Sequence, residues 1–282
     1  MSGLVPRRSV LYMPASNARA LEKAQTIPAD AIIFDLEDAV APDAKEEARE
    51  QACAAVRSGA YGRRELTIRC NGLDTTWGRA ALAAASAAGP AAVVIPKVPG
   101  AAHLDEVAAL AGGTRIWAMV ETPAAIFTAR EIARHPAVDV LVLGTNDLAK
   151  ELRAALVPGR APLLPHLATA LLAAREAGKV ILDGVYNDVK DLDGLRDECV
   201  QGAQMGFDGK TLVHPAQVGE ANRAFSPTEA EVEHAARVIA AFEQASREGR
   251  GVVTVDGRMI ENLHVDNARR VLATAQAIAA FD

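Results

Sequence analysis

Short runs of β-branched and other apolar residues alternate with stretches rich in alanine, leucine and glutamate along most of this sequence. A parallel sheet covered by helices requires such an alternation, because each buried strand must be followed by a crossover that returns the chain to the same edge. Eight apolar runs are present: Ser9–Met13, Ala31–Leu36, Leu66–Cys70, Ala92–Pro96, Ile116–Val120, Val138–Leu143, Val180–Leu182 and, less clearly, Phe207–Val213.

Seven helix-like segments lie between these runs: Ala18–Gln25, Ala44–Arg57, Trp77–Ala88, His103–Ala111, Ala124–Ala133, His166–Glu176 and Leu192–Met205. Eight strands joined by seven helices fit a (β/α)8 TIM barrel better than a doubly wound sheet, which usually has fewer strands. A length of 282 residues, half of them apolar, suffices for one large core, although length alone also allows two small domains. We therefore predict an α/β protein with a TIM barrel over residues 1–225.

The remaining residues, 226–282, predict a C-terminal helical extension. Thr228–Glu248 has an apolar stripe on one side of a charged helix, Gly249–Gly257 has the composition of a loop or short hairpin, and Val265–Ala280 is a second helix. We expect the first helix to contribute to the barrel wall. The alanine-rich face of the second is suited to a subunit interface.

The charge balance and the cysteines exclude several classes of protein. Thirty basic and 36 acidic residues give a net charge of −6, and no basic cluster suggests a nucleic-acid surface. Three widely spaced cysteines fit neither a metal knuckle nor a disulfide framework. The N-terminus lacks the apolar stretch of a signal peptide, and no window is apolar enough for a membrane span. We expect a cytoplasmic enzyme.

Polar residues follow nearly every apolar run, where a TIM barrel places its active site. They are Asp35, Glu37 and Asp38 at the end of the second run, Arg69 and Asn71 at the third, Lys97 after the fourth, Glu121 after the fifth, Asp147 after the sixth, Asp183 after the seventh, and Lys210 and His214 at the eighth. Carboxylates without accompanying cysteine or histidine favour a hard cation such as Mg²⁺. Glu121 and Asp147 are the predicted ligands, the alternative for each being a helix-capping or solvated acid.

Three basic residues and one histidine have alternative interpretations. Arg69 lies within a strand and is either a buried partner of Glu37 or Asp38 or a bidentate ligand for a substrate carboxylate, roles that are compatible. Lys97 and Lys210 either offset the acidic mouth and hold anionic groups or are rim lysines. His214, which precedes a proline, is more easily explained as structural.

Taken together, these residues resemble the citrate lyase β-subunit-like branch of the HpcH/HpaI aldolase superfamily, which includes malyl-CoA, citramalyl-CoA and citryl-CoA lyases and malyl-CoA thioesterases. The resemblance spans almost the whole chain. It rests on the ordered motifs Arg8–Ser16, Phe34–Val40, Ile68–Asn71, Pro96–Val98, Met119–Pro123, Leu143–Leu148, Asp183–Tyr186, Gly206–Lys210 and His214-Pro215.

The resemblance implies a role for each matching residue. Glu121 and Asp147 match magnesium ligands, and Arg69 matches the arginine that binds the carboxylate or oxo-acid end of the substrate. Glu37 and Asp38 match acids that hold water of the magnesium shell and orient the arginine. In the cleavage direction a base takes the 3-hydroxyl proton and the C2–C3 bond breaks, which leaves a thioester enolate.

Two places depart from the family pattern. Lyases of this family commonly have an aspartate in a C-terminal Met-Ile-Asp sequence that reaches a neighbouring subunit's site, whereas this chain has Glu261 after Met259-Ile260. The N-terminal motif has Asn17-Ala18-Arg19 where a Pro-Lys or Pro-Arg pair is common, and Arg19 and Lys23 are candidate contacts for CoA phosphates. The extra methylene of Glu261 shifts the carboxylate, which disfavours lyase activity in a preorganised site and leaves metal binding unaffected.

Three functions follow from the resemblance. The leading one is a Mg²⁺-dependent C–C lyase that cleaves a 3-hydroxyacyl-CoA to an acyl-CoA and a 2-oxo acid. A thioesterase that hydrolyses the same substrate is its nearest alternative, with Glu37 or Glu261 activating the water. The third, an idle CoA-binding subunit, is disfavoured by the intact Arg69, Glu121 and Asp147. The expected partners are small molecules and other copies of the chain, as a homotrimer or homohexamer, with neither nucleic acid nor membrane.

Overall fold

The computed structural model describes residues 4–249 and 252–281. The described residues divide into two compact units, one of residues Arg7–Phe225 and one of residues 4–6, 226–249 and 252–281. The parts of the predicted barrel and extension that fall on residues 1–3, 250–251 and 282 lie outside the described residues.

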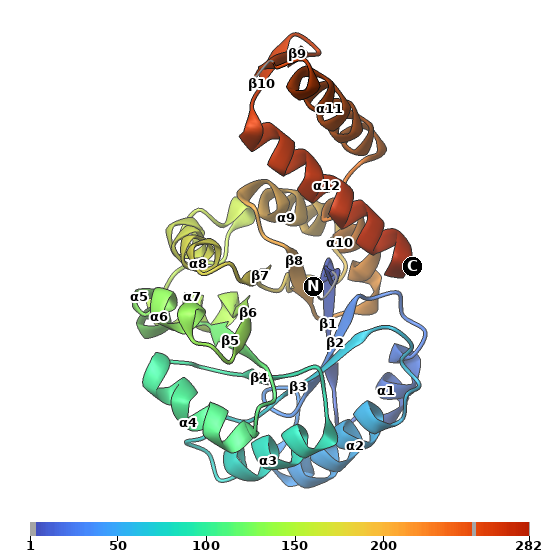
Figure 1. Cartoon of the computed structure of the whole chain (residues 1–282). Coiled ribbons are helices and arrows are strands. Elements are labelled where there is room, and N and C mark those ends of the chain that lie inside the picture. Colours follow the sequence, from blue (N-terminus) through green and yellow to red (C-terminus); the bar gives the residue numbers. More distant parts are fainter. Residues whose placement is uncertain (1–3, 250–251, 282) are drawn as a thin grey trace. The chain divides into compact units, whose positions relative to one another are not determined.

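The first unit is a closed barrel of eight parallel strands in sequential order, with β8 hydrogen-bonded to β1 (Figure 1). The predicted TIM barrel is therefore confirmed. The strands are β1 (Ser9–Pro14), β2 (Ala31–Asp35), β3 (Glu65–Arg69), β4 (Ala92–Ile95), β5 (Ile116–Val120), β6 (Val138–Leu143), β7 (Val180–Asp183) and β8 (Gly209–Leu212).

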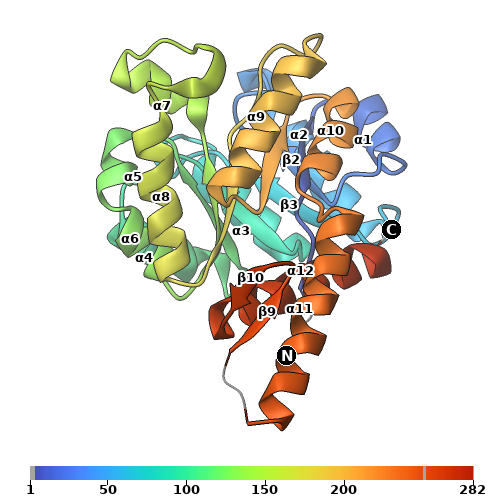
Figure 2. The same cartoon turned by 90° about the horizontal axis from the view of Figure 1, so that it is seen from above.

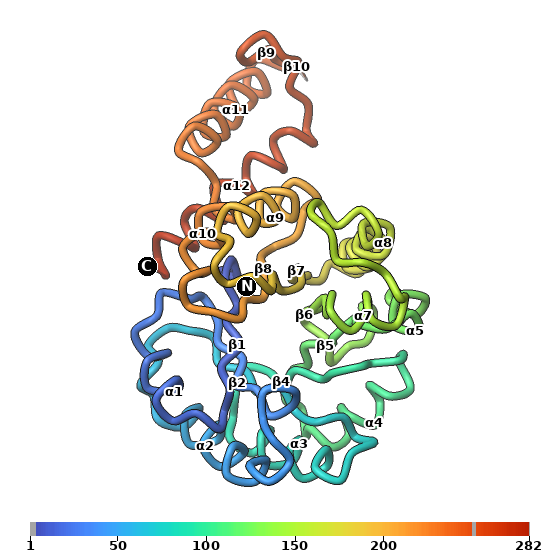
Figure 3. The backbone as a smooth tube through the Cα atoms, turned by 180° about the vertical axis from the view of Figure 1, so that it is seen from behind, coloured from blue at the N-terminus to red at the C-terminus, as the bar shows by residue number. Residues whose placement is uncertain are grey.

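Helices surround this barrel, as Figure 3 shows for α1 to α4 and α8. The helices of the first unit are α1 (Ala18–Ala24), α2 (Lys45–Arg57), α3 (Gly78–Ala88), α4 (Ala101–Ala111), α5 (Pro123–Phe127), α6 (Ala129–Arg134), α7 (Thr145–Leu152), α8 (Leu164–Glu176), α9 (Leu192–Met205) and α10 (Val218–Ala224), with short 3-10 turns η1 (Pro42–Ala44), η2 (Pro158–Arg160) and η3 (Pro215–Gln217). In Figure 2, α8 and α9 run along the outside of the strands.

Three helical features differ from the sequence-based prediction. The segment predicted as one helix over Ala124–Ala133 is two short helices, because Thr128 leaves helical geometry at φ −101° and ψ 7°. Helices α7 and α10 were not predicted. Each has only about two turns, too short for an apolar period to stand out.

The second unit contains α11 (Glu229–Arg247), a hairpin of β9 (Val253–Val255) and β10 (Arg258–Ile260), and α12 (Asn262–Phe281). A capping box between Thr228 and Glu231 starts α11. The hairpin turns through Asp256 and Gly257, both at positive φ, as a two-residue turn of type I′ requires. Its core is separate from that of the barrel and includes Val238, Val255, Ile260 and Val265 among its buried residues.

Candidate functional site

The interior of the barrel changes from apolar to charged at the carboxyl ends of the strands. Because successive side chains of a strand point to opposite faces of the sheet, every second side chain points into the barrel. The apolar side chains among these are Val10, Ala31, Ile33, Ala92, Val94, Trp117, Met119, Val140, Val142 and Leu182. Continuing by twos along β1, β2 and β5 gives Tyr12, Asp35 and Glu121, and Arg69 of β3 pairs in register with Asp35. Strand periodicity therefore directs these four side chains into the barrel mouth.

Asp35 and Arg69 form a buried bidentate ion pair. The Nε and Nη2 groups of Arg69 donate to the two carboxylate oxygens of Asp35, each over 2.7 Å. Burial alone would raise the pKa of Asp35, but the guanidinium outweighs burial and lowers it below its ordinary value. The guanidinium carbon also lies 4.9 Å from the centre of the Tyr12 ring, a cation–π distance. Arg69 is thus held rigidly on one edge and one face.

The loop after β2 wraps around the other edge of Arg69. Asp35 accepts hydrogen bonds from the backbone amides of Glu37 and Ala39, which shape this loop. Arg69 Nη1 then lies 3.0 Å from Glu37 Oε2 and 3.4 Å from Asp38 Oδ2. Burial raises the pKa of Glu37, against the opposing effect of Arg69. Three carboxylates therefore surround one guanidinium.

Lys97 connects this cluster to Glu121. Its ammonium lies 3.2 Å from Glu37 Oε1, and its backbone amide donates to Glu121 Oε1 over 2.7 Å. Lys97 has φ +49°, in the left-handed region that non-glycine residues seldom adopt. This conformation accompanies a backbone amide directed at a buried carboxylate.

Glu121 is an acid with too little positive charge around it. It is 1 % exposed, and among the described residues only the amide of Lys97 donates to it. Burial, and next the negative charge of Glu37, raise the pKa of Glu121 to about 8. Gly144 lies against this side chain, and a Cβ at that position would overlap Oε2 and Cβ of Glu121.

Asp147 completes the mouth from the first turn of α7. It lines a cavity of about 330 Å³ together with Tyr12, Arg69, Glu121 and Asp38, among others. Residues from β1, β2, β3, β5, β6 and the start of α7 therefore face one space. A cavity of this size accommodates a small organic acid.

The donors fit a magnesium ion. Four acids line the cavity; Asp35 and Asp38 pair with Arg69, which leaves Glu121 and Asp147. Burial and the nearby negative charge of Glu37 disfavour the ionised form of Glu121, which a bound cation would stabilise. Within residues 4–249 and 252–281, no three His, Cys, Asp or Glu side chains gather as a complete metal site. Mg²⁺ commonly takes only one or two protein carboxylates and completes its shell with water and substrate oxygens. The pair Glu121 and Asp147 is consistent with this mode of binding.

The structure brings most of the predicted site residues together. Arg69, Glu37, Asp38, Lys97, Glu121 and Asp147 meet at the barrel mouth. Arg19 and Lys23 lie exposed on α1 and are not among the residues that line the cavity. Glu261 is an exposed residue between β10 and α12 of the second unit.

Lys210 and His214 have structural partners. Lys210 is fully buried and contacts Asp183 and Glu198 rather than the mouth, so neither the anion-holding nor the rim interpretation holds. His214 Nδ1 accepts from the amide of Ala216 and caps η3, in line with its predicted structural role.

Sequence reasoning missed Asp35 as the principal partner of Arg69, and Tyr12 beneath the guanidinium. A signal for both was present. Tyr12 and Asp35 stand two residues beyond Val10 and Ile33, on the face that fills the barrel. Counting by twos along each predicted strand would have identified them.

Comparison with known proteins identifies the family. The model of the HpcH/HpaI aldolase/citrate lyase family matches residues 8–215, and that of a C–C bond lyase of the TIM-barrel fold matches residues 161–279. A (3S)-malyl-CoA thioesterase of Cereibacter sphaeroides is 55 % identical over 276 residues, which cover 98 % of this chain and 97 % of the relative. The citrate lyase β subunit of Escherichia coli is 36 % identical over 96 % of this chain and 93 % of its own length.

A solved structure agrees with these relatives. The protein CitE of Mycobacterium tuberculosis, in complex with magnesium, acetoacetate and coenzyme A, superposes with a TM-score of 0.78 at 30 % identity, covering 95 % of this chain and 97 % of that one. No described helix is long and apolar enough to cross a membrane. The chain is therefore an enzyme of the HpcH/HpaI aldolase/citrate lyase family, in the branch of the citrate lyase β subunits and malyl-CoA thioesterases.

Proposed function

We propose that this enzyme hydrolyses the thioester of a 3-hydroxyacyl-CoA of the malyl-CoA type, with Mg²⁺ held by Glu121 and Asp147. The observation that carries the proposal is the cavity shared by Arg69, Glu121 and Asp147, which pairs a fixed guanidinium with two acids suited to a metal. The 55 % identity to (3S)-malyl-CoA thioesterases over nearly the full length of both chains supports hydrolysis as the reaction.

The charges at the mouth suit a substrate with a carboxylate at one end. When bound, Mg²⁺ supplies the positive charge that lets a hydroxy-acid end enter a cavity already lined by acids. Arg69 contributes the guanidinium donors that Asp35 leaves free on Nη1 and Nη2, so that a substrate carboxylate binds in place of the contact with Asp38. Asp35 and Tyr12 keep the guanidinium in place.

We assign the role of base to Glu37. Its carboxylate contacts both Lys97 and Arg69, and Arg69 lines the cavity. In hydrolysis, Glu37 accepts a proton from water as the water oxygen bonds to the thioester carbonyl carbon. The C–S bond then breaks, and the proton passes to the departing CoA sulfur. The products are a hydroxy dicarboxylic acid and free CoA.

A C–C lyase is the second candidate, and the same site supports it. The citrate lyase β subunit at 36 % identity favours cleavage of the bond between C2 and C3. In that reaction a base takes the 3-hydroxyl proton, the bonding electrons pass to the acyl-CoA as an enolate, and Glu261 of a neighbouring subunit returns a proton. Glu261 replaces the aspartate common in family lyases, which is why we place hydrolysis first.

Three further assignments belong to this proposal. Arg19 and Lys23 follow β1 on the exposed side of α1 and are proposed to contact the phosphates of CoA. The enzyme is proposed to act as a homotrimer or homohexamer, in which the segment around Glu261 of one copy reaches the barrel of another. In hydrolysis, the Glu261 carboxylate is proposed to help hold the attacking water from which Glu37 takes the proton.

Counting products distinguishes the two reactions. The enzyme is incubated with (3S)-malyl-CoA and Mg²⁺, and free thiol and glyoxylate are measured in the same samples. Hydrolysis releases one thiol for each substrate consumed and no glyoxylate. Glyoxylate in proportion to substrate consumed, with the thioester retained as acetyl-CoA, would replace hydrolysis by C–C cleavage.

A further inference from the structure

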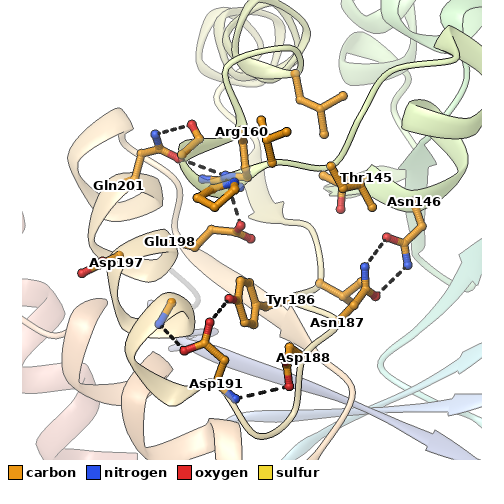
Figure 4. A pocket seen from close by; sticks show the side chains of 17 residues that line it. Thr145, Asn146, Arg160, Tyr186, Asn187, Asp188, Asp191, Asp197, Glu198 and Gln201 are labelled. Atoms are coloured by element: carbon orange, nitrogen blue, oxygen red, sulfur yellow. Dashed lines mark hydrogen bonds and ion pairs between the residues drawn. The ribbon is translucent and has the colours of Figure 1, made fainter.

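Four charged side chains, three of them buried and Glu198 partly exposed, form a cluster on the outer side of the barrel, away from the cavity that Glu121 lines. Arg160 Nη1 lies 2.7 Å from Asp183 Oδ1, and Lys210 Nζ lies 3.1 Å from Asp183 Oδ2 and 2.7 Å from Glu198 Oε1. Asp183 and Lys210 are fully buried, and Arg160 is 4 % exposed. Figure 4 shows Arg160 between Glu198 and Gln201, beside a second cavity of about 510 Å³. We call these four residues the buried charge cluster.

This cluster fixes the end of β7. Asp183 Oδ1 also accepts from the backbone amide of Gly184 over 2.8 Å, and the Thr211 hydroxyl donates to the backbone oxygen of Asp183 over 3.1 Å. The side chain and backbone oxygen of Asp183 and the backbone amide of Gly184 are thus all held by hydrogen bonds or ion pairs. The peptide between these two residues therefore has little freedom to shift when its neighbours move.

Gly184 in turn contacts the start of α7. A Cβ on Gly184 would overlap Oγ1 and Cγ2 of Thr145, so the two residues lie as close as a glycine allows. Thr145 is 4 % exposed and is the first residue of α7. Asp147 stands two residues later, and both line the cavity with Glu121. A displacement of Thr145 therefore moves the carboxylate of Asp147.

We propose that Gly184, anchored by the buried charge cluster, is a positioning residue that sets the start of α7 and so directs Asp147 at the metal. The inference rests on the proposed metal site and adds the residues that determine its geometry from the outer side of the barrel. Mg²⁺ requires nearly ideal octahedral geometry, so a small shift of one ligand weakens binding. Residues that support a metal ligand typically change metal affinity by about 10- to 100-fold when replaced.

Direct metal binding tests the proposal without any assay of activity. Mn²⁺ serves as the probe, and its free fraction is measured by electron paramagnetic resonance. In Gly184→Ala the added methyl group pushes Thr145, and we expect Mn²⁺ to bind about tenfold more weakly or worse. Gly202→Ala applies a milder push from α9, since its Cβ would lie 2.9 Å from Asp183 Oδ2, and should weaken binding in the same direction but less.

A compensating variant distinguishes positioning from general damage. Replacing Thr145 by alanine removes both atoms that the new methyl group overlaps, and leaves its own Cβ at 3.0 Å. The double variant Gly184→Ala/Thr145→Ala should therefore bind Mn²⁺ within about twofold of Thr145→Ala alone. Gly194→Ala is the matched control, because its Cβ would overlap Tyr186, in the loop after β7, and Asp191, the N-cap of α9, but not Thr145. Its Mn²⁺ affinity should stay at the wild-type value.

Glu121→Gln separates failure of this inference from failure of the metal site. Lost binding in Glu121→Gln, with wild-type affinity in both Gly184→Ala and Gly202→Ala, would overturn the positioning role and leave the metal site standing. Equal weakening in Gly194→Ala, or no recovery in the double variant, would also overturn it. Wild-type binding in Glu121→Gln, or no binding by the unaltered enzyme, would overturn the metal site and the positioning role together.

Discussion

Arg69 is the residue on which the electrostatics of the barrel mouth depend. Its guanidinium is the counter-charge for Asp35, Glu37 and Asp38, and it lies over the Tyr12 ring. The planar guanidinium donates to both oxygens of Asp35 and still presents donors on its other edge. The ammonium group of a lysine cannot do both. The identity of this cation should therefore matter beyond its charge.

Arg69→Lys should retain the fold, since a positive charge still faces Asp35, but lose about 100-fold in kcat/KM through poorer orientation of the substrate carboxylate. Steady-state kinetics with (3S)-malyl-CoA measure this loss. Arg130→Lys is the control, because Arg130 makes an exposed pair with Glu176. Turnover and KM close to those of the unaltered enzyme would reduce Arg69 to a structural role.

Glu121→Gln should abolish the stabilisation of the protein by Mg²⁺. A ligand that binds only the folded state at 100 times its Kd adds about 2.7 kcal/mol to the free energy of unfolding. Thermal unfolding with and without Mg²⁺ should show this gain for the unaltered enzyme and for Glu151→Gln, which changes an exposed acid on α7. An undiminished Mg²⁺ effect in Glu121→Gln would place the metal elsewhere.

Most residues of the barrel mouth were predictable because each is a charged residue at the end of an apolar run. Glu121, Asp147 and Arg69 each follow or end a strand, and in a barrel all strand ends of one kind meet. The contacts that these residues make with one another were harder to predict. That Arg69 pairs bidentately with Asp35, with Glu37 and Asp38 on its other edge, depends on the register of β2 against β3, which a list of strand ends does not contain.

At the scale of elements, buried ion pairs as well as apolar packing hold β7, β8 and α9 together. The buried charge cluster balances two cations against two anions. Its low exposure makes each member dependent on the others, because an unpaired charge in such surroundings is costly. Gly202 of α9 gives Asp183 the room it needs.

Asp183→Asn should destabilise the enzyme by about 3–5 kcal/mol, since it leaves Arg160 and Lys210 buried with one anion fewer. The midpoint of urea unfolding measures the change. Asp193→Asn, on the exposed surface of α9, should change stability by less than about 0.5 kcal/mol. A similar midpoint for both variants would show that the cluster contributes little.

The elements that were predicted correctly are those with long, regular patterns. The eight strands and the long helices α2, α8 and α9 follow from apolar periodicity, whereas α7 and α10 are short and were not predicted. The omission of α7 matters most, because Asp147 was assigned to a strand end and in fact belongs to a helix. Its direction is set by Thr145 and Gly184, a contact between elements that no local pattern encodes.

At the scale of the whole molecule, the proposed assembly makes a specific claim about Glu261. Its segment belongs to a unit with a core of its own, and Leu263 and Met259 on either side of it are more than half exposed. Closed rings of identical contacts would let each copy supply this segment to the next.

Mixing two inactive variants tests supply of Glu261 in trans. Arg69→Lys and Glu261→Ala, each weak alone, should recover activity after subunit exchange, because hybrid oligomers contain sites with both residues intact. The activity of mixtures at several ratios measures the recovery. If exchange is verified by mass and activity does not rise, Glu261 acts within its own chain or has no part in the reaction.

The most direct measurement of the central claim is the fate of oxygen from isotopically labelled water. The enzyme is incubated with (3S)-malyl-CoA in labelled water, with Mg²⁺ or with a chelator. The masses of the products are then measured by mass spectrometry. The account predicts malate that carries one labelled oxygen in its new carboxylate, formed with Mg²⁺ and lost both with the chelator and in Glu121→Gln. Acetyl-CoA and glyoxylate in place of labelled malate, or labelled malate at an undiminished rate in Glu121→Gln, would contradict it.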